Sequence, residues 1–347
     1  MPKGEEQRAL DIHRKSIVIN GLEVGFFYQK FLPRYLEELS AYFKKLIDAG
    51  ITAGNHTVCD PPQADFNEFL RGVYDSYTWI ENNADRATLI TSVDDIEMAK
   101  KDKKFGLILG TQSAKFLGDD LTKLGIARKL GLMIIQLTYQ RRNYVGDGCG
   151  ERTDSGLSKF GIKLIEEMDK LGIVIDLSHV GKTTTMDAME VSKNPVIFSH
   201  SSAKALLNHG RNIDDEQIKT VAEKKGVVGI CSWSPLLVRP PYTDNPKLET
   251  LLDHIDYVVK LVGVDHVGFG LDIPEGWIKE DFEATKKLFP EVYPTRFEEW
   301  PMEGLESTTK MLNLTMGLVA RGYSDQDIGR MLGGNFIRVF KDVWRKI

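Results

Sequence analysis

The sequence predicts an α/β protein: a single (β/α)8 TIM barrel with C-terminal helices that close it. Short runs of β-branched and apolar residues alternate with amphipathic helical stretches, which is typical of a parallel sheet. There are eight such runs, and this number favours closure into a barrel. The chain has 347 residues, 42% of them hydrophobic, which is enough for a large buried core.

The elements follow one another regularly along the chain. The predicted strands are Ser16–Asn20, Ile51–Gly54, Gly106–Gly110, Leu132–Thr138, Ile173–Ser178, Pro195–Ser199, Val227–Ser232 and His266–Leu271. The stretches between them carry apolar residues at helical spacing, as in the stripe of Leu39, Phe43 and Leu46. The tail from Ser324 to Ile347 predicts two closing helices separated at Gly333–Gly334. No repeat or composition break divides the chain, so residues 1–347 are expected to form one domain.

The bulk properties exclude several classes of protein. The formal charge of −5 and the lack of a basic stripe argue against a nucleic-acid partner. No apolar run reaches the roughly 18 residues that a membrane span requires, so no membrane partner is expected. The polar N-terminus does not resemble a signal peptide. Cys59, Cys149 and Cys231 are widely spaced, which fits a reducing cytoplasm better than a disulfide framework.

Polar side chains stand at the ends of three predicted strands. His179 follows the fifth strand, His200 the sixth and Asp272 the eighth. Catalytic groups of such barrels lie at the C-terminal ends of the strands, so these three side chains are expected at one mouth. Two histidines and a carboxylate can hold a metal ion with open positions. His56, after the second strand, is a candidate further ligand.

Two other features have simpler interpretations. Cys231 falls inside the seventh strand and is expected to be a small buried hydrophobic residue rather than a nucleophile. Gly268–Gly270 lies within the eighth strand, which indicates close packing rather than phosphate binding.

Several longer motifs resemble the membrane (renal) dipeptidase family of amidohydrolase-type metal-dependent barrels. The similar runs are GIKLIEEMDKLGIVIDLSHV, NPVIFSHSSAKAL, HGRNIDDEQIK, DHVGFGLD and LGGNFIRVF. They extend over most of the chain and are densest from Leu157 to Asp215. The resemblance implies a barrel that binds two zinc ions, hydrolyses dipeptides and forms a homodimer. By motif, His179 and His200 match the ligands of the second metal, Asp272 the catalytic aspartate and Arg211 the substrate-binding arginine.

The other half of the family's site is missing from this sequence. Leu22 and Val24 stand where the family has a His-x-Asp pair, and Gln112 stands at its bridging glutamate. Tyr139 replaces a histidine after the fourth strand. Leucine and valine cannot bind a metal, and a neutral amide offers only one carbonyl oxygen. We therefore expect at most one divalent ion (zinc, iron or manganese) on His179 and His200, and no two-metal site.

The residues that remain predict an enzyme acting on a small carboxylate-bearing, amide- or dipeptide-like substrate. Asp272 would act as the base and Tyr139 as an acid or electrophile. Four side chains are predicted to bind the substrate: Arg211, Asn20, Gln112 and Arg142. A non-hydrolytic reaction (elimination, isomerisation or oxidation) and an inactive small-molecule-binding homologue are the alternatives. An ordinary two-metal dipeptidase would need ligands from elsewhere in the chain.

Overall fold

The computed structural model describes residues 2–25, 35–59, 64–238, 246–275, 278–288, 290, 296–299 and 302–344. Its centre is a parallel sheet whose eight barrel strands follow one another in chain order, β1-β2-β4-β5-β6-β7-β8-β9. The strands are β1 (Ile19–Glu23), β2 (Ala53–Thr57), β3 (Ala87–Leu89), β4 (Phe105–Thr111), β5 (Leu132–Gln136), β6 (Val174–Asp176), β7 (Ile197–Ser201), β8 (Val227–Ile230) and β9 (Val267–Phe269). Each of the eight predicted strands has a counterpart here, so the predicted barrel is confirmed.

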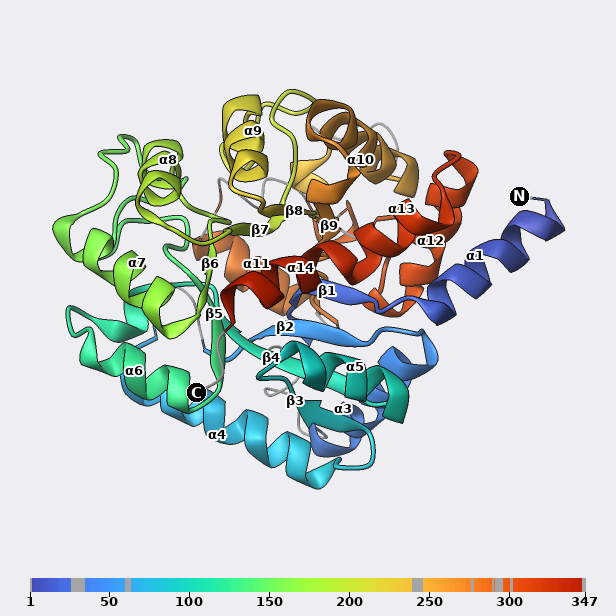
Figure 1. Cartoon of the computed structure of the whole chain (residues 1–347), viewed down its shortest axis with the longest axis horizontal. Helices are drawn as coiled ribbons and strands as arrows, with labels where there is room; N and C mark the ends of the chain where they lie inside the picture. Colours follow the sequence, from blue (N-terminus) through green and yellow to red (C-terminus); the bar gives the residue numbers. More distant parts are fainter. Residues whose placement is uncertain are drawn as a thin grey trace.

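Helices surround the strands on the outside (Figure 1). They are α1 (Lys3–Lys15), α3 (Tyr35–Asp48), α4 (Phe66–Asn82), α5 (Val93–Asp102), α6 (Thr122–Lys129), α7 (Lys159–Leu171), α8 (Lys182–Val191), α9 (Asp215–Glu223), α10 (Leu248–Val262), α11 (Lys279–Leu288), α12 (Met311–Ala320), α13 (Asp325–Gly329) and α14 (Asn335–Val343). The stripe of Leu39, Phe43 and Leu46 on α3 is fully buried, as its helical spacing predicts.

The structure differs most from the prediction at two strands, while several other strands are shorter or shifted by one or two residues. The first strand begins at Ile19 rather than Ser16 and continues through Gly21 to Glu23. Gly21 stays within the strand because its backbone lies against β7, where an added Cβ would come 2.6 Å from the Ser199 carbonyl oxygen. The short strand β3 was not predicted, since two of its three residues are only partly buried and the strand carries no alternating pattern. It pairs with the start of β4, from Phe105 to Leu107.

Asn20 joins the two ends of the sheet. Its side-chain oxygen accepts a hydrogen bond from the Leu271 amide at 2.9 Å. Beside it, the Asp272 amide donates to the Leu22 carbonyl oxygen at 3.4 Å. The Asn20 side chain therefore replaces part of the backbone hydrogen bonding that would otherwise join β1 to the segment that follows β9.

Helix α14 closes the N-terminal end of the barrel and crosses the middle of the view in Figure 1. Its buried apolar side chains form one cluster with residues at or near the starts of the strands: Phe336, Val339, Phe340 and Val343 with Ile19, Ala53, Ile108, Ile134, Val174, Ile197 and Val227. The predicted closing helices are confirmed, but Gly333–Gly334 does not separate them. A π-helical turn, Arg330–Gly334, connects α13 directly to α14.

Close packing explains the glycines of the last strand, as predicted. A Cβ at Gly268 would lie 2.6 Å from the Phe336 ring, and one at Gly270 would lie 1.8 Å from the Ser199 carbonyl oxygen. Within the described ranges, no helix combines the length and the apolar character needed to cross a membrane.

Candidate active site at the strand ends

Two histidines face each other at the C-terminal mouth of the barrel. His200 lies in β7, and His179 follows β6 by three residues. Their Nε2 atoms are 2.9 Å apart, and both side chains are buried. The prediction that these two histidines converge is confirmed by this contact.

Burial and charge keep both imidazoles neutral. Desolvation lowers the pKa of His179 and of His200 well below the ordinary value, and the positive charge of Arg211 lowers both pKa values further. A neutral imidazole has one nitrogen with a free lone pair, which is the form that can bind a metal.

Arg211 is a buried cation beside the pair. Its Nη1 donates to the Ser201 hydroxyl at 2.9 Å, and its Nη2 donates to the His200 carbonyl oxygen at 2.6 Å. These two acceptors are neutral. The guanidinium therefore keeps a positive charge that an anionic group of a substrate would complement.

Asp272 is held in a constrained backbone conformation next to this charge. Its φ is +55°, and that of His179 is +61°, both in the left-handed region that side chains other than glycine rarely adopt. Burial raises the pKa of Asp272 to about 7, although the charge of Arg211 opposes this rise. The carboxyl group can therefore exchange a proton near neutral pH, as a catalytic acid or base requires.

Cys231 and Tyr139 complete the surroundings of the mouth. Cys231 is fully buried at the end of β8, as predicted, and burial together with the Asp272 charge raises the pKa of its thiol. The half-buried Tyr139 stacks on His179, with ring centroids 4.2 Å apart and planes inclined by 23°. The structure therefore brings Tyr139 to the histidine pair.

The other predicted site residues have different contacts. The His56 ring packs against Trp79 of α4, with centroids 5.2 Å apart, which directs it toward the helix layer. Arg142 forms an ion pair with Asp147, and 55% of its side chain is exposed. The predicted roles of both residues stay predictions. Across the described residues, no group of three or more His, Cys, Asp and Glu side chains could hold a metal.

Asn20 and Gln112 are buried polar residues with hydrogen bonds to the barrel itself. Asn20 Nδ2 donates to the Glu23 carboxylate at 3.0 Å, in addition to the contact of its oxygen with Leu271. Gln112 Nε2 donates to the Thr57 hydroxyl at 2.9 Å. Their predicted roles in substrate binding stay predictions.

The first strand presents apolar groups where the resemblance implies metal ligands. Leu22 and Val24 are both buried. The Glu23 carboxylate accepts from the Tyr42 hydroxyl of α3 at 2.8 Å and from the Gly25 amide at 3.0 Å. Burial raises the pKa of Glu23 to about 7, and the nearby Glu275 charge contributes to the rise. Glu23 thus faces α3, away from the side of Leu22, as strand alternation predicts.

Sequence analysis missed Asp176 and Ser199. The Ser199 hydroxyl contacts both the Asp176 carboxylate and the His200 ring. Asp176 lies at the end of β6, three residues before His179, and Ser199 directly precedes His200. Asp176 is the first residue of the run DLSH, and Ser199 is the first residue of the run SH. Because a buried aspartate in a strand has no partner visible in the sequence, their link to His200 emerges only from the pairing of β6 with β7.

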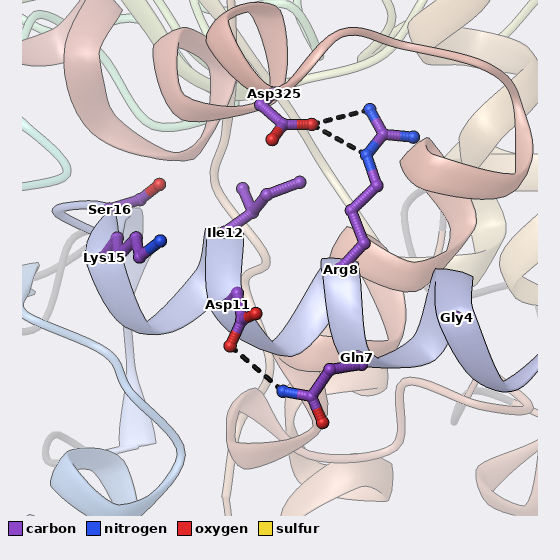
Figure 2. Close-up of a pocket in the computed structure, with 8 residues that line it drawn as sticks. All are labelled: Gly4, Gln7, Arg8, Asp11, Ile12, Lys15, Ser16 and Asp325. Carbon is purple, nitrogen blue, oxygen red and sulfur yellow. Dashed lines mark hydrogen bonds and ion pairs between the residues drawn. The ribbon is translucent and has the colours of Figure 1, made fainter.

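A separate surface hollow of about 440 Å³ lies between α1 and α13 (Figure 2). Three of its charged groups have partners: Arg8 pairs with Asp325 at 2.7 Å, and Asp11 accepts a hydrogen bond from Gln7 at 3.0 Å. It contains none of the residues discussed above.

The parallel barrel has the fold of a solved amidohydrolase, which places the protein in the class of amidohydrolase-type barrels. More particularly, the chain belongs to the membrane dipeptidase family, because the family described as "Membrane dipeptidase (Peptidase family M19)" matches residues 34–346.

Relatives and solved structures agree with this membership. The chain is 30% identical to the Dipeptidase tcpJ of Claviceps purpurea (strain 20.1) over 268 residues, which are 76% of this chain and 57% of that protein. It is 31% identical to the uncharacterized dipeptidase C965.12 of Schizosaccharomyces pombe over 256 residues, 72% of this chain and 55% of that protein. The chain thus spans little more than half the length of these curated relatives.

Among solved structures, an amidohydrolase from Pseudomonas aeruginosa has a TM-score of 0.84 and 32% identity, with 97% of this chain and 99% of that one covered. A metallo peptidase from Rhodobacter sphaeroides, liganded with a phosphinate mimic of the dipeptide L-Ala-D-Ala, has a TM-score of 0.77. It shares 20% identity, and the match covers 95% of this chain and all of that one (100%). At this identity the second likeness shows the fold alone.

Proposed function

We propose that the protein is a divergent hydrolase of the dipeptidase family that acts on a small, carboxylate-bearing, amide- or dipeptide-like substrate. The observation that carries the proposal is the His179–His200 pair, with Arg211 and Asp272 beside it. The dipeptidases among its relatives support the reaction class.

The two histidines fit one metal ion. Two nitrogens that each lie about 2.0–2.1 Å from one zinc ion are at most about 4.2 Å apart, and the Nε2 atoms of His179 and His200 are separated by 2.9 Å. Leu22, Val24 and Gln112 offer no carboxylate or imidazole for another ion. We therefore propose at most one divalent ion, held by His179 and His200, with the remaining positions open. When bound, it would polarise a carbonyl group or a water molecule.

The side chains around the pair have separate tasks. Arg211 holds the substrate carboxylate through its guanidinium, which already lies in a fixed position. Asp272 takes a proton from the attacking water at its carboxylate oxygen and later returns a proton to the leaving amine. Tyr139, stacked on His179, offers its hydroxyl as a donor at the edge of the mouth. Cytoplasmic location, a homodimer and a single domain over residues 1–347 remain part of the proposal.

Metal counting and a peptidase assay test the proposal together. The protein is purified under mild conditions, metal per chain is measured by elemental analysis, and release of amino acids from simple dipeptides is followed. We expect no more than one ion per chain, and we expect His200→Ala to lose both metal and activity. His266→Ala is the control, because this histidine bonds the Gly226 carbonyl at the opposite end of the barrel.

Three results would contradict the proposal. Two ions per chain would indicate an ordinary dipeptidase site. Conversion of the substrate without uptake of water would indicate elimination, isomerisation or oxidation. Tight binding of a dipeptide-like ligand without turnover would indicate an inactive homologue.

A further inference from the structure

A buried carboxylate lies behind His200. Asp176, at the end of β6, is 1% exposed, and both of its oxygens meet hydrogen-bond donors. Its Oδ1 accepts from the Ser199 amide at 2.9 Å and from the Ser178 amide at 3.0 Å. Its Oδ2 accepts from the Ser199 hydroxyl at 2.5 Å. Burial raises the pKa of this carboxyl group, and the hydrogen bonds from Ser199 and Ser178 oppose the rise. The three donors match the ionised form, which can only accept.

The same serine hydroxyl contacts the imidazole. Ser199 Oγ lies 2.6 Å from His200 Nδ1. A hydroxyl has one proton, and Ser199 gives it to Asp176, so Oγ must accept a hydrogen bond from His200. The ring proton of His200 is therefore on Nδ1, and the lone pair of Nε2 faces His179.

The packing leaves Ser199 little freedom to move. An added Cβ at Gly21, Gly229 or Gly270 would come 2.6, 2.1 and 1.8 Å, respectively, from the Ser199 carbonyl oxygen. The backbones of β1, β8 and the residue that follows β9 therefore pack closely against Ser199. On the other side, the Ser178 hydroxyl accepts from the His200 amide at 3.0 Å. The network thus fixes the backbone as well as the ring.

His179 has no equivalent support. Its Nδ1 is buried and makes no hydrogen bond to any described residue. The two histidines are consequently unequal: His200 is held in one tautomer, whereas His179 is oriented by Tyr139 stacking and by its Nε2 contact with His200.

We infer that Asp176 is a positioning residue that acts through Ser199 to fix the Nδ1–H tautomer of His200, so that the Nε2 lone pair is available for an ion shared with His179. The metal role rests on the proposed function, whereas the tautomer does not depend on it. Removing the hydrogen-bond partner of a metal-binding histidine commonly lowers the metal affinity by roughly 10–100-fold.

The sharpest test is Asp176→Asn, which keeps the shape but changes one acceptor into a donor. The amide oxygen can still accept from the Ser199 and Ser178 amides, while its NH2 group now points at Ser199 Oγ. The serine proton must then turn toward His200 Nδ1, and the ring proton moves to Nε2. The predicted result is an inverted tautomer, with the Nε2 lone pair lost.

Nitrogen NMR of the metal-free, 15N-histidine-labelled protein measures the tautomer directly, with the His200 signal assigned from His200→Gln. We expect Nδ1–H in the wild type, Nε2–H in Asp176→Asn and a mixture in Ser199→Ala. Competition titration with zinc should show affinity lowered by about 10–100-fold in both variants. Ser192→Ala is the matched control, because its buried hydroxyl also donates to a carboxylate, Asp169, at 3.1 Å but far from the pair.

Each outcome decides the inference. An Nε2–H tautomer in the wild type, or an unchanged His200 signal in Asp176→Asn, overturns it. If Asp176→Asn fails to fold, an unchanged signal in Ser199→Ala overturns it equally. If the tautomers behave as expected while the wild type binds no zinc and hydrolyses no dipeptide, the proposed function fails and the positioning role stands.

Discussion

At the residue scale, the candidate site depends on ionisable side chains that are buried away from water. His179 and Asp272 both have positive φ without being glycine, and such backbone strain concentrates at functional sites. Burial moves the pKa of the His179 imidazole downward and that of the Asp272 carboxyl upward. The same desolvation therefore favours a neutral ligand and a carboxyl group that titrates near neutral pH.

Asp272 predicts how activity depends on pH. A general base acts in its ionised form, and its pKa of about 7 predicts that kcat/KM for a dipeptide falls as pH decreases below 7. Asp272→Asn should lower kcat by roughly 10²–10⁴-fold and abolish this limb of the profile. The exposed Asp119→Asn serves as the control. An Asp272→Asn variant with the wild-type profile would exclude Asp272 as the base.

Glu23 predicts how stability depends on pH. Its pKa is raised to about 7 in the folded protein, so folding favours the protonated form, and this stabilisation is lost as pH rises from the unfolded value of 4.5 through 7. Glu23→Gln removes the titration. Its free energy of unfolding should therefore gain about 3 kcal/mol relative to the wild type between pH 4 and pH 8. Urea denaturation at both pH values measures this, with the exposed Glu6→Gln as control. A difference that does not change with pH contradicts the prediction.

Position in the chain predicted site residues only where they end a strand, whereas Arg211 was predicted from the family motif. His179, His200 and Asp272 follow apolar runs, and the structure brings the two histidines into contact. His56 also follows an apolar run, yet its ring packs on Trp79, because the face on which a side chain lies depends on strand register. Asp176 lies inside such a run, where a single sequence does not reveal its partner.

At the element scale, the strands and helices could be predicted because their burial is periodic. Apolar runs mark the eight barrel strands, which are buried on both faces as parallel strands are. The missed element, β3, is short and partly exposed. The predicted first strand ended at Asn20, whereas β1 continues through Gly21, whose backbone lies close to the Ser199 carbonyl oxygen.

The closure of the barrel between β1 and the segment that follows β9 depends on the Asn20 side chain. Asn20→Ala would leave the buried Leu271 amide without its acceptor and Glu23 without one donor. We expect a loss of about 1–3 kcal/mol in the free energy of unfolding. Chemical denaturation measures the loss, and Asn82→Ala, at an exposed position on α4, is the control. Equal stability of the two variants would show that this closure does not need the asparagine.

At the scale of the whole molecule, the two ends of the barrel have different tasks. The C-terminal mouth contains the histidine pair, whereas α14 fills the N-terminal end with apolar side chains. Phe336 is fully buried there and touches the backbone at Gly21 and Gly268.

Removing the Phe336 ring should therefore affect stability rather than chemistry. We expect Phe336→Ala to lower the free energy of unfolding by roughly 3–5 kcal/mol and to leave KM for a dipeptide unchanged in the folded fraction. Denaturant titration measures the free energy of unfolding, and steady-state kinetics measures KM. Tyr74→Ala, at a side chain that is 70% exposed, is the control. A changed KM with unchanged stability would contradict the separation of the two ends.

The crowding around the Ser199 carbonyl also limits how this enzyme family member can be redesigned. Gly21, Gly229 and Gly270 admit no side chain, since any Cβ would overlap a backbone atom that cannot retreat. These three glycine positions are therefore expected to tolerate no substitution, either in evolution or in a mutant library. New substrate preferences must come from the loops at the C-terminal ends of the strands, such as the segment that carries Tyr139. A library that randomises those loops and leaves the three glycines untouched will keep most of its members folded.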